Sequence, residues 1–208
     1  GHKFIESVLE YAGDEVEMTI LAEEPRLAYD RVHLTEYFTG KSAKDLTLCR
    51  SDFADAYGID LRLNTKATAI DTLNKTVSTN QGDVISYDKL VLATGSYAFV
   101  PPIPGNDREN CFVYRTIEDL DAIRAASLNA KSGVVIGGGL LGLEAAKALS
   151  DLNLETHVVE FAPRLMAVQI DDLGGKVLRA KIENLGVKVH TQKATSAIED
   201  GVNAKHVM

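Results

Sequence analysis

The pattern of apolar and polar residues is most informative between residues 133 and 160. Residues 133–136 form a short apolar run that predicts a strand. Glycines spaced as G-x-G-x-x-G follow at 137–142, and an alanine-rich stretch of helical character comes next. Residues 156–159 predict a second strand that ends at Glu160, placed to accept hydrogen bonds from an adenosine ribose. This order of elements predicts a dinucleotide-binding unit.

Five residues of the glycine turn have a physical role in holding a dinucleotide. Gly137 permits a tight turn, Gly139 lets backbone N–H groups approach a pyrophosphate, and Gly142 lets the helix lie close to the strand. Leu140 and Leu141 belong to the first helical turn, which offers unpaired N–H donors and the positive end of the helix dipole. We therefore expect these five residues to bind the cofactor.

A similar unit opens the chain. Gly1 starts an amphipathic helix, residues 16–21 predict a strand, and residues 23–26 resemble the Pro-Arg ending of residues 160–164. If the two helices have the same task, Gly1 is the third glycine of a first fingerprint. We then expect the chain to be a fragment that starts inside the first phosphate-binding turn, although a chain that simply begins with a helix has the same pattern.

The remaining segments predict short strands, one buried strand and a linker. Residues 31–58 have helical and loop-like character, and the apolar run 89–93 predicts a buried parallel strand. Three prolines make residues 100–106 the best linker candidate, and residues 116–119 resemble a capping box at the start of a helix. Further strands are predicted at 60–63, 66–71, 76–78, 84–87 and 187–191, and a further helix at 171–185.

These elements predict an α/β fold of two Rossmann-like dinucleotide-binding lobes, each a three-layer arrangement around a parallel sheet. A unit of this kind normally continues through further strands, so we also expect truncation at the C-terminal end. The predicted domains are residues 1–110 and 111–208.

Charge and cysteine content exclude several classes of function. The chain has 22 lysines and arginines against 30 aspartates and glutamates, a net charge of -8, which argues against a nucleic-acid partner and a membrane surface. Without an apolar run of transmembrane length or a visible signal peptide, we expect a cytoplasmic protein. Two cysteines, Cys49 and Cys111, are too few for an iron–sulfur cluster and too far apart in sequence for a redox-active motif. The histidines show no metal-ligand spacing, so no metal site is predicted.

Residues 23–34, 113–120 and 160–166 together resemble the two-dinucleotide flavoprotein reductases related to the pyridine nucleotide-disulfide oxidoreductases. Within that group they look like the large subunit of NAD(P)H-dependent nitrite reductase, and the likeness covers essentially the whole chain. Some relatives in this group have a proline and, four residues later, a lysine near the flavin. This chain has Val32 in place of that proline and Glu36 in place of that lysine. This departure fits the nitrite reductase branch better than the ferredoxin reductase branch.

The resemblance implies that the first domain carries FAD and the second NADH. It places Glu144 near the nicotinamide, although a first-turn acid favoured by the helix dipole would look the same. NADH is expected over NADPH because Glu160 repels a 2′-phosphate, with the nearby Arg164 as the opposing feature. The residues implied at FAD are Gly1, Glu23, Glu24, Arg31, Ala67, Thr94, Gly95 and Arg115.

The function implied by the resemblance is electron entry into a nitrite reductase. A hydride passes from NADH to FAD, and electrons continue to a sirohaem and a [4Fe-4S] cluster outside this chain, where nitrite is reduced to ammonia. The implied partners are NADH, the remainder of the nitrite reductase polypeptide and, as a further candidate, a small subunit. Two alternatives remain: an NADH-dependent rubredoxin or ferredoxin reductase, and a non-catalytic nucleotide-binding module.

Overall fold

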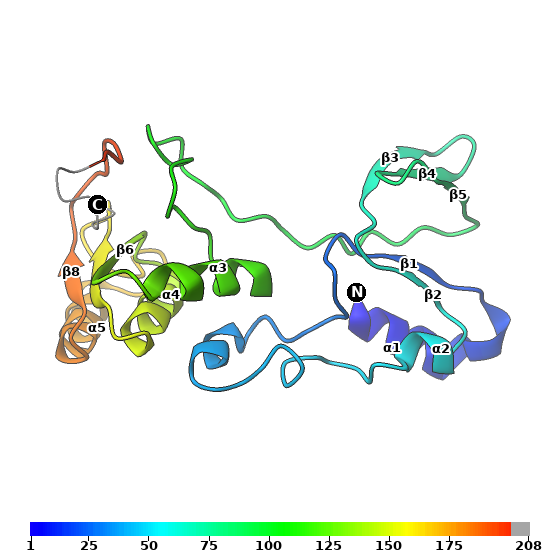
Figure 1. Ribbon diagram of the computed structural model, residues 1–208, viewed down its shortest axis with the longest axis horizontal. Coiled ribbons are helices and arrows are strands. Elements are labelled where there is room, and N and C mark those ends of the chain that lie inside the picture. Colours follow the sequence, from blue (N-terminus) through cyan, green and yellow to red (C-terminus); the bar gives the residue numbers. More distant parts are fainter. Residues whose placement is uncertain (201–208) are drawn as a thin grey trace. The chain divides into compact units, whose positions relative to one another are not determined.

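The chain folds into two compact units in a computed structural model that describes residues 1–200 (Figure 1). The first unit comprises Gly1–Asp30 and Ala43–Ser96, and the second comprises Arg31–Ser42 and the chain from Tyr97 onward. The short segment from Arg31 to Ser42 therefore packs with residues that follow it by more than fifty positions in sequence. The assignment of FAD to residues 1–110 and of NADH to residues 111–208 stays a prediction.

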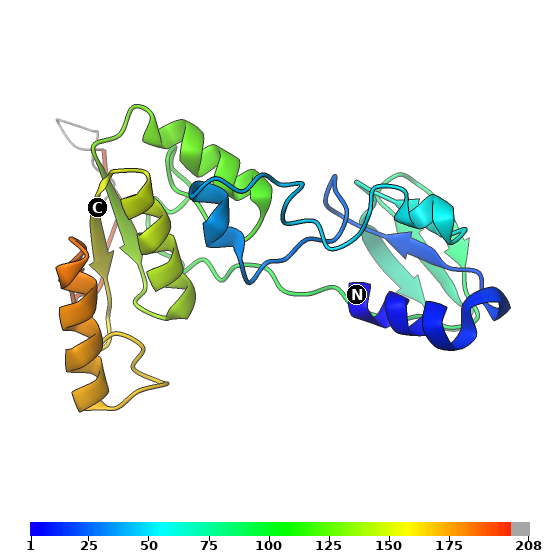
Figure 2. The ribbon, with the colours of Figure 1, turned by 90° about the horizontal axis from the view of Figure 1, so that it is seen from below.

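The first unit contains a parallel strand pair and an antiparallel sheet. Strand β1 pairs in parallel with β2, and β3, β4 and β5 form an antiparallel sheet in that order. Helices α1 and α2 lie on the same side of the β1–β2 pair (Figures 1 and 2). The elements are α1 (His2–Ala12), η1 (Gly13–Glu15), β1 (Thr19–Leu21), α2 (Phe53–Ala56), β2 (Asp60–Arg62), β3 (Ala67–Asp71), β4 (Thr76–Thr79) and β5 (Val84–Ser86).

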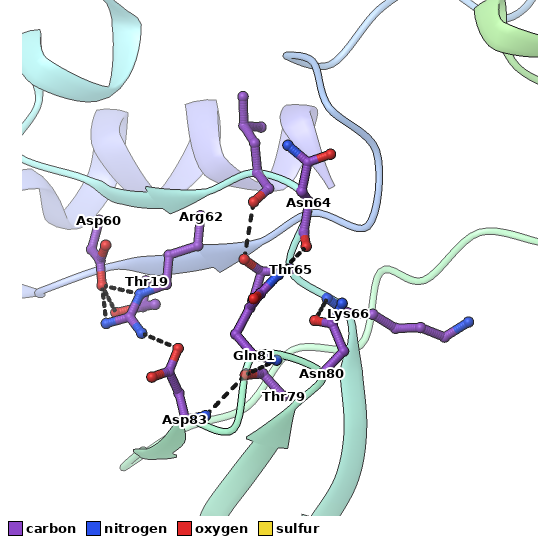
Figure 3. Close-up of polar contacts among 11 residues, drawn as sticks. Thr19, Asp60, Arg62, Asn64, Thr65, Lys66, Thr79, Asn80, Gln81 and Asp83 are labelled. Atoms are coloured by element: carbon purple, nitrogen blue, oxygen red, sulfur yellow. Dashed lines mark hydrogen bonds and ion pairs between the residues drawn. The ribbon is translucent and has the colours of Figure 1, made fainter.

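Polar contacts connect the antiparallel sheet to the parallel pair (Figure 3). Arg62 at the end of β2 donates to Asp60 at 2.9 Å and reaches Asp83, before β5, at 3.4 Å. The backbone N–H of Lys66 donates to the Asn80 side chain at 2.8 Å. The Arg62–Asp83 contact thus joins β2 to the antiparallel sheet, and the Lys66–Asn80 hydrogen bond joins the start of β3 to the end of β4.

The second unit is built on a three-stranded parallel sheet in the order β6–β7–β8. One cluster of its core lies between the sheet and the helices α4 and α5, and contains the buried residues Ala146, Val158, Leu165, Val187 and Val189. The elements are η2 (Leu34–Phe38), α3 (Ile117–Ser127), β6 (Ser132–Ile136), α4 (Leu140–Asp151), β7 (Glu155–Val159), α5 (Asp172–Asn184) and β8 (Lys188–His190).

Most predicted elements and the α/β fold class are confirmed. Thr116 and Asp119 form a reciprocal capping box at the start of α3, as the sequence predicts. The Asp171 side chain accepts a hydrogen bond from the Gly174 N–H at 2.8 Å and caps α5. Gly186 adopts a φ of +87° just after that helix, as predicted for the residue that ends it.

The prediction of a buried strand at residues 89–93 is wrong. This segment is irregular, and Val91 and Leu92 are 51% and 66% exposed. An apolar run becomes a central strand only where neighbouring strands supply backbone hydrogen bonds on both sides. Among the described residues no strand pairs with this segment, because the parallel pair of the first unit contains β1 and β2 alone.

Candidate dinucleotide-binding sites

The glycine turn of the second unit has the geometry that the sequence predicts. Gly137 follows β6 with a φ of +115°, a conformation that residues with a Cβ rarely adopt, and its N–H donates to the Val159 carbonyl at 2.8 Å. A Cβ added at Gly142 would lie 2.0 Å from the Gly137 carbonyl oxygen. The third glycine therefore lets α4 start directly against the turn.

The middle glycine faces open space. Gly139 is the residue before α4, with an ordinary extended backbone (φ -80°, ψ -175°). A Cβ added there would have nothing within 4 Å. Leu140 and Leu141 form the exposed start of α4 beside it, and the first N–H groups of a helix have no acceptor within the helix. This combination of open space and available donors fits a pyrophosphate.

Glu160 is held against the glycine turn. Its carboxylate accepts hydrogen bonds from the Gly138 N–H at 2.5 Å and from the Ala162 N–H at 2.6 Å. Its own backbone N–H donates to the His190 carbonyl at 2.8 Å. The acid predicted from the end of the second strand thus lies beside the turn, although its contact with Gly138 could not be read from spacing alone.

The loop after Glu160 packs under the turn. Leu165 is completely buried, and a Cβ at Gly138 would lie 2.6 Å from its Cδ2 atom. Met166 has a φ of +47° and its N–H donates to the Gly138 carbonyl at 2.8 Å. The loop and the glycine turn therefore form one hydrogen-bonded structure.

The Arg164 side chain forms its hydrogen bonds with the loop that follows it. Its guanidinium donates to the Ile170 carbonyl at 3.0 Å, to the Ala167 carbonyl at 3.1 Å and to the Asp172 carboxylate at 2.7 Å. A Cβ at Gly175 would lie 2.8 Å from the Arg164 Cδ atom. This side chain packs on the start of α5 and is not poised beside Glu160 to neutralise a phosphate.

Glu144 lies in the first turns of α4 in a partly buried position. Burial raises the pKa of its carboxyl above the ordinary value. Burial also raises the pKa of the Tyr114 hydroxyl, with a further contribution from the Glu144 charge, while the hydrogen bond to Thr35 at 3.1 Å acts in the opposite direction. Sequence reasoning missed Tyr114 and Thr35, because 79 positions separate them and no motif joins them.

The segment Arg31–Ser42 contacts α3 through a hydrogen bond and a cation–π interaction. The Tyr37 hydroxyl donates to Asp121 at 2.5 Å, and the Arg124 guanidinium lies over the Tyr37 ring, 4.2 Å from its centroid. The Arg31 guanidinium donates to the Arg115 carbonyl at 2.9 Å. The structure therefore brings together the two arginines that the resemblance implied for FAD, both within the second unit.

The acids predicted for the first cofactor have separate partners in the first unit. Glu23 is exposed and pairs with Lys66 at 2.9 Å. Glu24 is half-buried and accepts a hydrogen bond from the buried Tyr29 hydroxyl at 2.6 Å. Ala67 follows Lys66 as the exposed first residue of β3. Glu23 is therefore tied to the residue before β3, whereas Glu24 is bonded to Tyr29.

The other residues predicted for the first cofactor lie at the start of α1 and in the irregular segment. Gly1 precedes α1, and a Cβ added to it would lie 3.7 Å from the Ala93 Cβ atom. Thr94 and Gly95 follow Ala93 directly and are exposed, with a φ of +66° at Gly95. The helix start and the segment that leads into Thr94 and Gly95 are thus neighbours.

The described part of the chain contains no group of three or more histidines, cysteines or acids that could hold a metal ion. Both cysteines are reduced and half-buried. Burial, with the nearby Glu6 charge, raises the pKa of the Cys49 thiol, so the reactive thiolate is disfavoured. Among residues 1–200, no helix has the length and apolar character needed to cross a membrane.

The chain is similar to several known proteins. A family model described as pyridine nucleotide-disulphide oxidoreductase matches residues 5–208. The chain is 50% identical to the nitrite reductase (NADH) large subunit of Escherichia coli, with 100% of the chain and 25% of that protein covered. It is 56% identical to the nitrite reductase [NAD(P)H] large subunit of Klebsiella oxytoca, with 95% of the chain and 21% of that protein covered. The chain thus spans about a quarter of the length of these relatives.

A solved structure is also similar to this chain in its fold. The water-forming NADH oxidase from Lactobacillus brevis, bound to NADH, superposes with a TM-score of 0.88 at 25% sequence identity. The superposition covers 97% of this chain and 46% of that protein. The α/β architecture of both units therefore has a close structural counterpart.

Proposed function

Because the chain belongs to the pyridine nucleotide-disulphide oxidoreductase family, we propose that it is the electron-entry module of a nitrite reductase, where a hydride passes from NADH to FAD. Identities of 50% and 56% with nitrite reductase large subunits, over all or nearly all of the chain, support this role over that of a rubredoxin or ferredoxin reductase. The observation that carries the proposal is the glycine turn of residues 137–142 with Glu160 fixed against it.

In this proposal the second unit binds NADH. The pyrophosphate lies in the open space at Gly139 and accepts hydrogen bonds from the N–H groups of Leu140, Leu141 and Gly142. Glu160 accepts hydrogen bonds from the adenosine ribose with the carboxylate oxygens that already face the turn. Glu144, further along α4, lies toward the nicotinamide half.

Several residues are proposed for FAD. Gly1 and the Thr94–Gly95 segment would leave room for the cofactor, since the backbone there carries little or no side chain. Glu23 and Glu24 would accept hydrogen bonds from its ribose, and Ala67 would contact the adenine through its backbone. Arg31 and Arg115 complete the proposed set, the first at the phosphates and the second on the flavin side.

The protein contributes positioning and exclusion of water to this reaction. When bound, FAD supplies the redox chemistry by accepting a hydride from NADH and releasing electrons one at a time or in pairs. Holding the two rings in contact accounts for most of the rate gain, so no side chain is assigned as a general acid, base or nucleophile. Each NADH delivers two electrons, so three hydride transfers are needed for each nitrite reduced to ammonia.

The later steps would require groups held by residues outside this sequence. A [4Fe-4S] cluster needs about four thiolates, and the chain has two cysteines. We therefore assign the sirohaem and the cluster to the remainder of a nitrite reductase polypeptide, with a small subunit as a further candidate partner.

NADH is the proposed electron donor. The Glu160 carboxylate would lie close to a 2′-phosphate and repel it. Phe161 carries no charge, and the Arg164 guanidinium is occupied by the loop of residues 167–172. Glu160 would thus repel a 2′-phosphate, and residues 161–172 would supply no free cation to offset that repulsion.

An absorption spectrum tests the function directly. The purified protein is incubated with FAD, separated from unbound flavin and mixed with NADH without oxygen. We expect a yellow protein whose flavin band is bleached by NADH and restored by an added electron acceptor. A colourless protein that still binds NADH would contradict the enzymatic role and favour a nucleotide-binding module.

A further inference from the structure

Phe161 is an exposed aromatic residue directly after the acid that is held against the glycine turn. Its side chain is 78% exposed, although a phenyl ring gains free energy when it leaves water. Within residues 1–200, no other aromatic ring and no cation forms a ring contact with it. A single exposed apolar residue is ordinary on a protein surface, so its position decides what it can bind.

The backbone that carries Phe161 is fixed on both sides. The Ala162 N–H donates to the Glu160 carboxylate at 2.6 Å. The loop after β8 is bonded to the same segment, because the Gln192 N–H donates to the Ala162 carbonyl at 3.0 Å and the Lys193 N–H donates to the Glu160 carbonyl at 3.1 Å. The phenyl ring is therefore carried by an ordered loop, which lowers the entropy cost of a contact with a ligand.

This loop lies at the carboxyl edge of the parallel sheet. Strands β6 and β7 end together, since Ile136 is in register with Val159. The glycine turn follows the first of these strands, and Phe161 follows the second by two residues. Nucleotides bind to open α/β sheets in the crevice outside this edge. The exposed ring is therefore at the edge where the proposed dinucleotide lies.

The covalent structure of a nucleotide restricts where its base can lie. In the proposed site the adenosine 2′-hydroxyl bonds to Glu160. The base is attached to the neighbouring ribose carbon, so it must lie among the residues beside that carboxylate. The Gly138 side is filled, because an added Cβ there would lie 2.6 Å from the Leu165 Cδ2 atom and 3.1 Å from the Glu160 Cβ atom. The Phe161 side is open to solvent.

The two arginines near this loop do not compete for the phenyl ring. The Arg164 guanidinium is bonded to the residues that follow it. The Arg179 guanidinium donates to the Val189 carbonyl at 3.0 Å and to the Thr191 hydroxyl at 3.2 Å. A flat neutral base can therefore use the face of Phe161 by offset stacking, the arrangement that aromatic rings prefer.

We propose that Phe161 is the surface on which the adenine base of the dinucleotide stacks, beside the ribose acceptor Glu160. The inference rests on the proposed function, because it extends the same site from the ribose to the base. Every base has a π-face, so stacking on a phenyl ring adds affinity with little choice among bases. Phe161 thus contributes affinity for the base, while Glu160 discriminates at the ribose.

Tryptophan fluorescence tests this contact directly. The chain contains no tryptophan, so Phe161→Trp gives the protein a single indole at the position in question. ADP-ribose, which carries the adenosine and pyrophosphate of NADH, is titrated into this variant of the whole protein. An adenine stacked on an indole quenches its emission, so we expect quenching that saturates. Its midpoint should match the Kd that calorimetry gives for the same variant.

A second tryptophan variant provides the matched control. Leu185 is 62% exposed and follows the last turn of α5, just before β8 begins. It therefore lies at the amino edge of the parallel sheet, opposite the edge that carries Phe161. Leu185→Trp should bind ADP-ribose with the wild-type Kd and keep its emission unchanged.

Two further variants measure the contribution of the ring to affinity. In Phe161→Ala the Kd for ADP-ribose should rise about tenfold, within the range for loss of one base–aromatic stack. Phe161→Tyr keeps a ring that can stack, so its Kd should stay within about twofold of the wild type. The melting temperature of Phe161→Ala should equal that of the wild type, because the ring is exposed before the ligand binds.

The outcomes separate this inference from the proposed function. If the wild type binds ADP-ribose, an unquenched indole at position 161 or an unchanged Kd in Phe161→Ala would overturn the inference alone. Equal quenching in both tryptophan variants would also overturn it, because the effect would not depend on position. Absence of ADP-ribose binding in the wild type would overturn the proposed function and the inference with it.

Discussion

The Glu160 carboxylate accepts a hydrogen bond from the backbone N–H of Gly138 at 2.5 Å, so the acid at the end of β7 and the glycine turn after β6 are directly joined. A second hydrogen bond, from the Ala162 N–H at 2.6 Å, fixes the other carboxylate oxygen. The carboxylate is therefore oriented before any ligand arrives, which in the proposed role of Glu160 would reduce the entropy lost when a ribose binds. Its negative charge is fixed at the same position, where in the proposed site it would repel the 2′-phosphate of NADPH.

Replacement of Glu160 should change both affinity and discrimination. In Glu160→Ala the ribose loses a charged acceptor, worth about 1.5–3 kcal/mol, so the Kd for NADH should rise by roughly one to two orders of magnitude. The Kd for NADPH should stay constant or fall, because the repulsion of its 2′-phosphate is removed. Titration of both cofactors against the purified variant measures the two values.

A surface carboxylate provides the matched control for this variant. Glu183 pairs with Arg179 on the outside of α5 at 2.8 Å, and both side chains are 43% exposed. Glu183→Gln removes the same unit of charge from the same lobe and should leave both Kd values unchanged. Identical shifts in the Glu160 and Glu183 variants would show that only the net charge of the lobe matters.

Gly139→Ala should weaken dinucleotide binding with little effect on the free energy of unfolding. The added methyl group has open space around it, and the backbone conformation is one that alanine adopts. The free energy of unfolding should fall by less than about 1 kcal/mol, the scale of a changed helix-cap residue. Dinucleotide affinity should fall at least about tenfold, because the methyl group occupies the space where the pyrophosphate approaches the turn. Urea unfolding and NADH titration check the two values, and unchanged affinity would exclude Gly139 from the site.

Gly142→Ala should instead damage the fold. Its Cβ would lie 2.0 Å from the Gly137 carbonyl oxygen, and backbone cannot move aside as a flexible side chain does. We expect a loss of about 1–3 kcal/mol in the free energy of unfolding, as for other overpacked positions. Thermal unfolding measures the loss, and a variant as stable as the wild type would contradict the close approach of α4 to the turn.

Sequence alone predicts the parts of this molecule that depend on local spacing. The tight turn at Gly137, the close helix approach at Gly142, the Thr116 capping box and the Gly186 helix end all follow from requirements within a few residues. The structure reproduces each of them. Glu160 belongs to the same class, since the end of a strand and the next acid are both visible in the sequence.

Features that depend on distant partners could not be predicted in this way. The apolar run 89–93 has the composition of a buried strand, but a strand also needs hydrogen-bonding neighbours, and composition does not supply them. The contact of Thr35 with Tyr114 and that of His157 with His190 join residues 79 and 33 positions apart. No local motif marks such pairs, so only the structure locates them.

Arg164→Ala should affect stability and leave cofactor choice unchanged. The guanidinium holds the 167–172 loop through two carbonyl groups and Asp172. The free energy of unfolding should fall by about 1–2 kcal/mol, because the carbonyl hydrogen bonds are lost and the Asp172 pair is partly exposed to water. The ratio of NADH to NADPH affinity should remain that of the wild type. A marked loss of NADPH binding in this variant would show that Arg164 leaves its loop to bind the 2′-phosphate.

Glu144→Gln should make the protein less sensitive to pH. Burial raises the pKa of the Glu144 carboxyl in the folded state, so the folded protein holds this proton more tightly than the unfolded chain does. Stability is therefore lost as pH rises through the interval between the unfolded and folded pKa values. Glutamine stays neutral, so the variant should gain stability relative to the wild type at about pH 7 and show no such gain at about pH 3.5, where both side chains are uncharged. Urea unfolding at the two pH values measures the difference, and an equal effect at both would mean that packing of the amide, rather than desolvation of the carboxylate, explains the change.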